Sequence, residues 1–360
     1  MFLISQKTIF IPTRAVTVGR IFTLRDSLLP LLACALVAGC NDLGNPAPGL
    51  PVDTPVGRMV PFGGELPMQV VTTCGMVSDI VREVAGDRGN VVSLMGEGVD
   101  PHLYKPTRND VQELLDADIV FYSGLMLEGR MADTFAKVGR SGKPVFAVSE
   151  TLDESTLLEP PEFEGHWDPH VWMDVAAWSE AVGFVAEALC AFDADGAEQY
   201  QQRAAAYQEK LKGLDEYVRQ TIATIPDEQR VLITAHDAFG YFSRAYDIPV
   251  RSVQGISTES EAGVDDINQL VSFIVERKIR AIFVESSVSQ KNIQAVIEGA
   301  ANSDWEVTIG GELYSDAMGP AGTYEGTYVG MLDHNATTIA RALGGRAPDG
   351  GWQGELSAGE

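Results

Sequence analysis

Basic residues are scarce in this chain, which has 26 lysines and arginines against 51 aspartates and glutamates and a net charge of −25. Proteins that bind nucleic acid use clustered Lys and Arg to neutralise phosphates, so this composition argues against nucleic acid as a partner. The excess of acid is typical of a protein that must stay soluble in a salty or extracytoplasmic medium. It can also gather cations near a binding site, although acidity alone does not identify such a site.

Long apolar runs are also absent beyond the N-terminus. A leader with four basic residues and no acid before Asp26 precedes a 13-residue apolar segment, 27–39, which is too short to cross a membrane and is typical of an export signal. The segment ends in Leu36-Val-Ala-Gly-Cys40, which resembles a bacterial lipobox and predicts cleavage before Cys40 with lipid on its sulfur. An ordinary cleavage site with an incidental cysteine is the alternative. We therefore expect a lipoprotein signal peptide at 1–39 and a flexible, Pro- and Gly-rich stalk at 40–67.

Cysteine is rare, with four residues in the whole chain. Cys34 would leave with the signal and Cys40 would carry lipid, so Cys74 and Cys190 remain. Their separation excludes the C-x-x-C spacing of zinc and redox sites. An oxidising compartment would permit a disulfide between them, but we favour two separate buried thiols.

Strand-like and helix-like segments alternate from Met68 onward, which predicts an α/β protein with parallel sheets, and the length predicts two domains. The expected strands cover 68–73, 91–95, 119–122 and 145–148 in the first half, and 231–234, 249–253, 281–284 and 307–309 in the second. The expected helices cover 76–85, 107–116, 128–138, 175–192, 197–225, 238–246, 265–278, 289–300 and 327–343.

This alternation predicts two β/α lobes, at 68–194 and 226–345, each with a parallel four-stranded sheet. A long linking helix at 195–225 joins them, and a Gly-rich tail at 346–360 is expected to be disordered. The linking helix has one apolar face made by Tyr200, Ala204, Tyr207, Leu211, Leu214, Val218 and Ile222. A rigid helix of this kind resists wide hinge motion, and ligands of parallel sheets sit beyond the carboxyl ends of the strands.

Histidine is equally scarce, and three of the five histidines lie in similar short loops beside apolar segments. His102 and His170 each end an Asp-Pro-His tripeptide, in which the proline fixes the approach of the chain and so aims the imidazole. His236 ends an apolar strand-like segment, and Asp316 follows the last expected strand. Two of these four residues lie in each half of the chain, as expected for one metal ion held between two lobes.

Three imidazoles and one carboxylate form a four-coordinate set that suits Zn²⁺, and Mn²⁺ or Fe²⁺ can use it as well. Taken singly, a loop histidine or aspartate is usually a turn or capping residue, so the prediction depends on the joint pattern. Glu285 ends a strand and could orient a ligand imidazole through its other nitrogen, with a solvated carboxylate as the alternative. We expect His166 to lie in a solvated loop, with a weak accessory role as the alternative. His334 is expected to pack or cap, and Trp172 to be a core residue, with a place in the wall of the cleft as the alternative.

Several segments carry a resemblance to a known family. They include Gly98-Val-Asp-Pro-His-Leu-Tyr-Lys-Pro-Thr107, Asp168-Pro-His-Val-Trp-Met-Asp174, Thr234-Ala-His-Asp-Ala-Phe-Gly-Tyr-Phe242 and Glu312-Leu-Tyr-Ser-Asp-Ala-Met-Gly319. The chain resembles the zinc- and manganese-binding solute-binding lipoproteins of bacterial metal ABC importers over about residues 68–343. Within them it is most similar to the TroA-like branch of the ZnuA/PsaA family.

The resemblance implies two β/α lobes joined by a rigid helix, with one ion in the cleft between them. By motif, the family's ligands correspond to His102, His170, His236 and Asp316. Two departures leave the metal open. Zinc-dedicated members often carry a His-rich acidic loop, whereas the acidic segment 151–166 holds only His166. Many manganese-dedicated members have Glu at the position of His236.

The sequence therefore predicts a monomeric, lipid-anchored extracytoplasmic receptor, in the periplasm or at the cell surface. It would capture one Zn²⁺ or Mn²⁺ ion, or an Fe²⁺ ion, and deliver it to a membrane permease without catalysis. A zinc-dependent hydrolase is one alternative, but a catalytic zinc keeps an open position and no His-Glu-x-x-His pattern occurs. A metal-stabilised surface adhesion protein is the other.

Overall fold

A computed structural model describes residues 59–357 of the chain. The expected signal peptide at 1–39, the lipidation site Cys40 and the stalk up to residue 58 lie outside the described residues. Their assignment therefore stays a prediction. Residues 59–67, expected to belong to the flexible stalk, instead contact the first lobe: the Phe62 N–H donates to the Phe192 carbonyl at 2.7 Å, and the two rings lie 5.6 Å apart.

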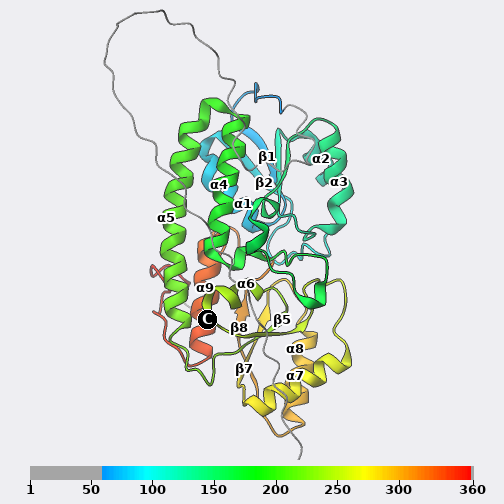
Figure 1. Ribbon diagram of the computed structural model, residues 1–360, viewed down its shortest axis with the longest axis vertical. Coiled ribbons are helices and arrows are strands. Elements are labelled where there is room, and N and C mark those ends of the chain that lie inside the picture. The colour runs from blue at the N-terminus through cyan, green and yellow to red at the C-terminus, as the bar shows by residue number, and fades with distance from the viewer. Residues whose placement is uncertain (1–58, 358–360) are drawn as a thin grey trace, which may run out of the picture. The chain divides into compact units, whose positions relative to one another are not determined.

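The first lobe is built on a parallel four-stranded sheet (Figure 1). Its elements are β1 (Met68–Thr72), α1 (Gly75–Ala85), β2 (Gly89–Ser93), α2 (Arg108–Asp116), β3 (Ile119–Tyr122), α3 (Ala132–Arg140) and β4 (Val145–Ala147). The strand order is β2-β1-β3-β4, so β1 and β3 are central, and both are almost wholly buried, as a sheet covered on both faces requires. Thr107 begins α2 with the expected capping box, because its hydroxyl accepts the Asp110 N–H and the Asp110 carboxylate accepts the Thr107 N–H.

The second lobe alternates strands and helices in the same way. Its elements are β5 (Leu232–His236), α6 (Gly240–Tyr246), β6 (Val250–Gln254), α7 (Val264–Arg277), β7 (Ala281–Glu285), α8 (Lys291–Ala301), β8 (Thr308–Leu313) and α9 (Tyr328–Ala342). The strands form two parallel pairs, β5–β6 and β7–β8, where the sequence predicted one four-stranded sheet. At their carboxyl ends β5 and β7 are joined through a side chain, since Glu285 Oε1 accepts the His236 N–H at 2.9 Å in place of a backbone carbonyl.

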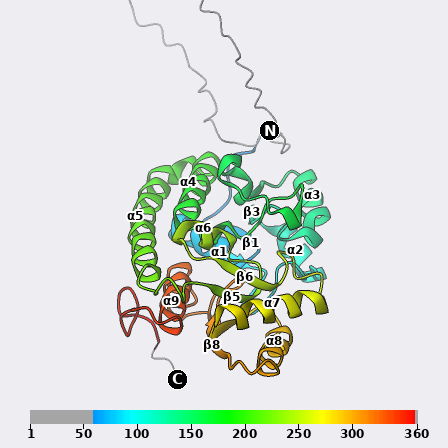
Figure 2. The same cartoon turned by 60° about the horizontal axis from the view of Figure 1, so that its bottom comes forward.

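Two long helices, α4 (Val175–Phe192) and α5 (Ala197–Ile222), run along one side of the protein, away from α7 and α8 (Figures 1 and 2). The seven apolar residues predicted to form one face of α5 are all buried. α5 packs against α1 through the Tyr207–Asp79 hydrogen bond of 2.6 Å, and against α9 through the Tyr217–Thr337 hydrogen bond of 2.7 Å. It therefore links the two lobes, as the sequence predicted. Against the expectation that no long apolar segment follows the N-terminus, α4 is apolar and long enough to cross a membrane, but its burial is that of a core helix.

The C-terminal segment differs from the prediction of a disordered tail. Residues up to 357 are described, and the backbone N–H of Trp352 donates to both carboxylate oxygens of Asp333 at 2.9 Å. The indole lies over Gly213 of α5, where a Cβ would come within 2.8 Å of the ring. Ser357 N–H donates to Glu325 at 2.7 Å. The many glycines suggested disorder, but Trp352 and hydrogen bonds to the buried carboxylates of Asp333 and Glu325 fix the segment against the protein.

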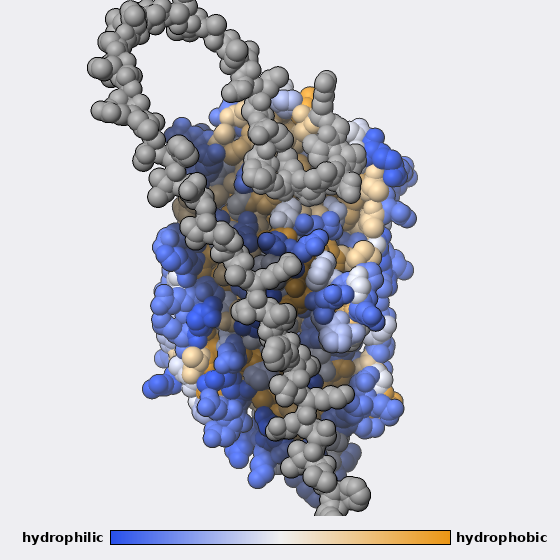
Figure 3. Space-filling view, viewed as in Figure 1, coloured by the Kyte–Doolittle hydropathy of each residue, from blue (hydrophilic) through white to orange (hydrophobic). Residues whose placement is uncertain are grey.

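Hydrophilic side chains dominate the surface visible in Figure 3, in keeping with the acidic composition. Apolar side chains fill the interior. Trp172, Trp178 and Tyr328 are fully buried there, and the Trp178 ring contacts both of the other rings. Trp172 is thus a core residue, as expected.

Asp79 of α1 gives the first prediction. Burial raises its pKa to about 6, against the hydrogen bond from Tyr207, so the folded protein prefers the neutral carboxyl. Stability from this group is fully present below pH 4 and is lost as the pH rises through 6. Asp79→Asn should match the wild type in urea unfolding near pH 4 and be more stable at pH 8, by on the order of 2 kcal/mol. An equal difference at both pH values would contradict the assignment.

Candidate metal centre

The four residues singled out from the sequence come together between the lobes. His102 lies in the loop between β2 and α2, His170 just before α4, His236 at the end of β5 and Asp316 after β8. One donor atom from each lies within 4.8 Å of the other three. His170 and His236 are 0% exposed, Asp316 1% and His102 5%.

The repeated Asp-Pro-His tripeptide builds the same turn twice. Asp100 Oδ1 accepts the His102 N–H at 2.9 Å, and Asp168 Oδ1 accepts the His170 N–H at 3.0 Å. Each aspartate thus bonds the backbone two residues further on, which is the geometry of an Asx turn. The intervening proline fixes φ, so both imidazoles leave a constrained backbone.

Two carboxylates orient the buried imidazoles of His170 and His236 through Nδ1, while Nε2 of each ring faces the cluster. His170 Nδ1 lies 2.7 Å from Asp168 Oδ1, and His236 Nδ1 lies 2.5 Å from Glu285 Oε2. A carboxylate at Nδ1 fixes that nitrogen as the donor, which leaves Nε2 available to a metal. Glu285 was singled out from its place at the end of β7. Asp168 was given no role, although its position two residues before His170, matching Asp100, was the available signal.

The separations between donor atoms suit one small cation. His170 Nε2 is 3.3 Å from His102 Nε2 and 3.3 Å from Asp316 Oδ1, and His236 Nε2 is 3.2 Å from Asp316 Oδ2. Donors at about 2.1 Å from an ion in tetrahedral geometry would lie about 3.4 Å apart. His236 Nε2 and both Asp316 oxygens are buried, and none of them makes a hydrogen bond within the described protein. Buried polar atoms normally have partners, so these atoms point to a bound cation.

Burial and neighbouring charges shift the pKa values of these four groups in opposite directions. Burial lowers the pKa of His102 to about 3. Burial also disfavours the charged form of His170, but nearby carboxylates, Asp316 first, raise its pKa to about 9. At His236 burial is again outweighed, and the charges of Glu285 and Asp316 raise the pKa well above its ordinary value. The imidazolium charges of His236 and His170 hold the pKa of Asp316 well below its usual range in spite of burial.

The loop that carries Asp316 is fixed by the aromatic core. Trp172 Nε1 donates to the Ser315 carbonyl at 2.9 Å, and Tyr328 donates to the Trp172 carbonyl at 2.7 Å. The Trp172 ring also meets His170 edge-on, with centroids 5.4 Å apart. Trp172, which was expected mainly to fill the core, therefore supports two of the four site residues.

The remaining candidates lie outside the cluster. His166 is exposed and contacts Phe163, as expected for a loop histidine. His334 of α9 lies 2.9 Å from the Glu312 carbonyl, in a packing role. Cys74 is buried and Cys190 partly buried, and no disulfide joins them. Burial raises the pKa of the Cys74 thiol to about 12, so it is held as the neutral form.

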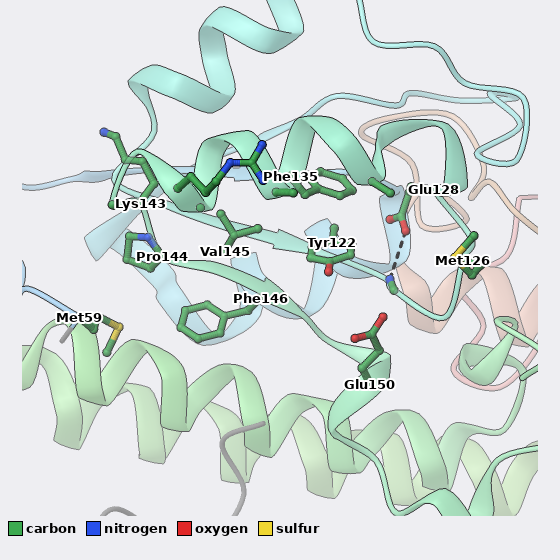
Figure 4. A pocket seen from close by; sticks show the side chains of 17 residues that line it. Met59, Tyr122, Met126, Glu128, Phe135, Lys143, Pro144, Val145, Phe146 and Glu150 are labelled. Carbon is green, nitrogen blue, oxygen red and sulfur yellow. Dashed lines mark hydrogen bonds between the residues drawn. The ribbon is translucent and has the colours of Figure 1, made fainter. Parts of the chain in front are cut away.

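A separate cavity of about 640 Å³ lies in the first lobe beside α3 and β4 (Figure 4). Its lining is largely apolar, with Tyr122, Phe135 and Phe146 among the walls and Glu128 and Glu150 toward one end. The Glu128 carboxylate is already engaged, since it accepts hydrogen bonds from Thr73, Ser123 and Gly124. None of the four clustered residues lines this cavity, so it is distinct from the candidate metal centre.

Comparison with known proteins gives close relatives. The zinc-binding protein TroA of Treponema pallidum is 50% identical over 274 residues, which cover 76% of this chain and 88% of that protein. The manganese-binding lipoprotein MntA of Bacillus subtilis is 46% identical over 277 residues, covering 77% and 90%. The solved structure of the Treponema pallidum protein aligns with a TM-score of 0.74 and 49% identity, over 77% of this chain and 99% of that one.

A family model described as "Zinc-uptake complex component A periplasmic" matches residues 70–342. The match spans both lobes and includes all four clustered residues. The chain belongs to this family, the ZnuA family.

Proposed function

We propose that this protein is the extracytoplasmic substrate-binding lipoprotein of a metal ABC importer. It captures one divalent transition-metal ion with His102, His170, His236 and Asp316 and delivers it to a membrane permease. The observation that carries the proposal is the buried cluster in which His236 Nε2 and both Asp316 oxygens have no hydrogen-bond partner among residues 59–357. Relatives named for zinc or manganese binding support the same function.

The ion is cargo, and its handling is binding without catalysis. Each ligand has a separate role in the proposal: three neutral imidazoles supply nitrogen, and Asp316 supplies oxygen and one negative charge. Asp168 and Glu285 hold two of the imidazoles in orientation. A catalytic zinc keeps one position open to water, whereas four buried ligands can close the shell, so the hydrolase alternative is not supported.

The choice of metal stays between Zn²⁺ and Mn²⁺, with Fe²⁺ as the third candidate. Nitrogen donors favour Zn²⁺, which such a site also binds more tightly than Mn²⁺ or Fe²⁺. The relatives at 50% and 46% identity are named for zinc and for manganese respectively, so both ions belong in a competition titration.

Lipid on Cys40, after removal of residues 1–39, would tether the receptor as a monomer to the membrane, in the periplasm or at the cell surface. The lipobox-like sequence and the lipoprotein names of relatives support this anchoring. The part of the stalk before residue 59 would let the two lobes reach the permease.

Removal of one ligand should weaken binding while the fold is retained. Structural zinc sites bind with about 10–16 kcal/mol in total, so one ligand of four is worth roughly 3 kcal/mol, or about a hundredfold in affinity. His102→Ala is the sharpest choice because His102 lies at the edge of the cluster. Competition with a chromogenic chelator measures the loss, and His166→Ala is the matched control. Equal affinity in the two variants would remove His102 from the site.

Ion binding should release protons at neutral pH. The pKa of His170 is raised to about 9 and that of His236 well above its ordinary value, so both imidazoles carry protons before the ion arrives. An ion binds only the neutral Nε2, so binding displaces these protons, and affinity should rise as the pH increases from 6 toward 9. Calorimetry at pH 7 in buffers of different ionisation enthalpy should report about two protons released per ion. Binding heats independent of the buffer would contradict this assignment.

A further inference from the structure

The two lobes also meet outside the proposed metal site, through polar contacts around the loop that follows β6. From that loop, Thr258 Oγ1 donates to Asp100 Oδ2 at 2.6 Å. The next residue, Glu259, accepts a hydrogen bond from Arg130 Nε at 2.7 Å. Asp100 and Arg130 belong to the first lobe, so both contacts bridge the lobes.

Asp100 joins this bridge directly to a proposed ligand. Its Oδ1 accepts the backbone N–H of His102 at 2.9 Å, while its Oδ2 accepts the Thr258 hydroxyl. A single carboxylate thus fixes the turn that carries His102 and bonds to the opposite lobe. Movement of either lobe that breaks the Thr258 bond frees one side of that turn.

Thr258 is itself held firmly by its own lobe. Gln254, the last residue of β6 and only 7% exposed, donates to the carbonyls of Thr258 at 3.0 Å and Ser260 at 2.7 Å. In the β5–β6 register Gln254 pairs with His236. The loop is therefore tied to the strand next to a second proposed ligand.

The bridge lies on the side of the site nearest solvent. His102 is 5% exposed while the other three proposed ligands are 1% or less, and its neighbour Leu103 is 42% exposed. Arg130 Nη1 also reaches the Leu103 carbonyl at 3.4 Å. His102 is therefore the most exposed of the four proposed ligands.

We propose that Asp100 is a positioning residue and that its bond to Thr258 is an interlobe latch. The latch holds the His102 turn over the ion, and the ion is released when this bond breaks. This inference rests on the proposed function, because it concerns release from the same site.

The two bridging contacts differ in weight. The Thr258 hydroxyl bonds a carboxylate, and Thr258 is 8% exposed, so this hydrogen bond is charge-assisted and largely shielded from water. The side chains of Arg130 and Glu259 are 32% and 50% exposed, and such surface pairs contribute little and are screened by salt. Thr258 is therefore the residue to change.

Thr258→Val removes the hydroxyl and keeps the shape of the side chain. Transfer of bound Zn²⁺ to excess chelator should become about tenfold faster or more, the usual scale for a lost charge-assisted hydrogen bond. The stoichiometry of one ion and the absorption spectrum of bound Co²⁺ should not change, since all four ligands remain. Thr258→Ser keeps the hydroxyl and should restore the wild-type rate.

Thr308→Val is the matched control. It also removes one threonine hydroxyl bond, to the Arg280 carbonyl at 3.1 Å, but Thr308 begins β8, at the end of the strand away from Asp316. It should leave the transfer rate unchanged. Glu259→Gln should alter the rate less than about threefold, and only at low salt.

Hydrogen exchange on the wild-type protein gives a second measurement that needs no variant. Ion binding should slow exchange in residues 254–260 as well as in residues 100–104. Protection of the first-lobe turn alone, or equal transfer rates in Thr258→Val and Thr308→Val, would overturn the latch while the receptor function stands. A wild-type protein that binds no ion would overturn the proposed function, and the latch with it.

Discussion

The buried carboxylate of Asp316 is the constraint on which the site depends. It is 1% exposed, both oxygens lack hydrogen bonds within the described protein, and its near neighbours are imidazole nitrogens. A carboxylate removed from water in this way is costly unless positive charge lies beside it. The raised pKa values of His170 and His236 favour protons as the source of that charge in the free protein, and the proposed ion would supply it in their place. Positive charge beside Asp316 thus stabilises its carboxylate both in the free protein and in the proposed ion-bound protein.

The fold has to bring that carboxylate to histidines from the other lobe, and the helices do so. α5 carries a continuous buried face and bonds to both lobes through Tyr207 and Tyr217. The aromatic line of Trp172, Trp178 and Tyr328 crosses the same region, and it fixes the Ser315 carbonyl beside Asp316. Wide hinge opening would expose these aromatic contacts to water. Local movement of loops is the less costly way to open the site.

Much of the fold and the candidate site could be predicted because their signals are local. The strand and helix segments follow apolar periodicity, and the α5 face follows from spacings of three and four. The Asp-Pro-His turns are visible as tripeptides. The second lobe was expected to hold one four-stranded sheet, but its strands form two parallel pairs, and the hydrogen bond that connects them joins His236 and Glu285, which are far apart in the chain. The sequence also did not predict that Asp333 would accept a hydrogen bond from the backbone of Trp352, or that Thr258 would donate to Asp100, because neither contact is local in the chain.

A receptor must bind its ion tightly and still give it up, and the unequal support of the proposed ligands bears on this conflict. His170 and His236 are backed by carboxylates at Nδ1, and the Asp316 loop is held by Trp172, so these three have little freedom to move. His102 instead lies on a backbone turn. Asp100 stabilises this turn, and Asp100 in turn accepts a hydrogen bond from Thr258 of the opposite lobe. Loss of one ligand from a four-coordinate ion weakens binding steeply. Displacement of His102 would therefore weaken binding by about a hundredfold and favour release, with the rest of the site intact for the next ion.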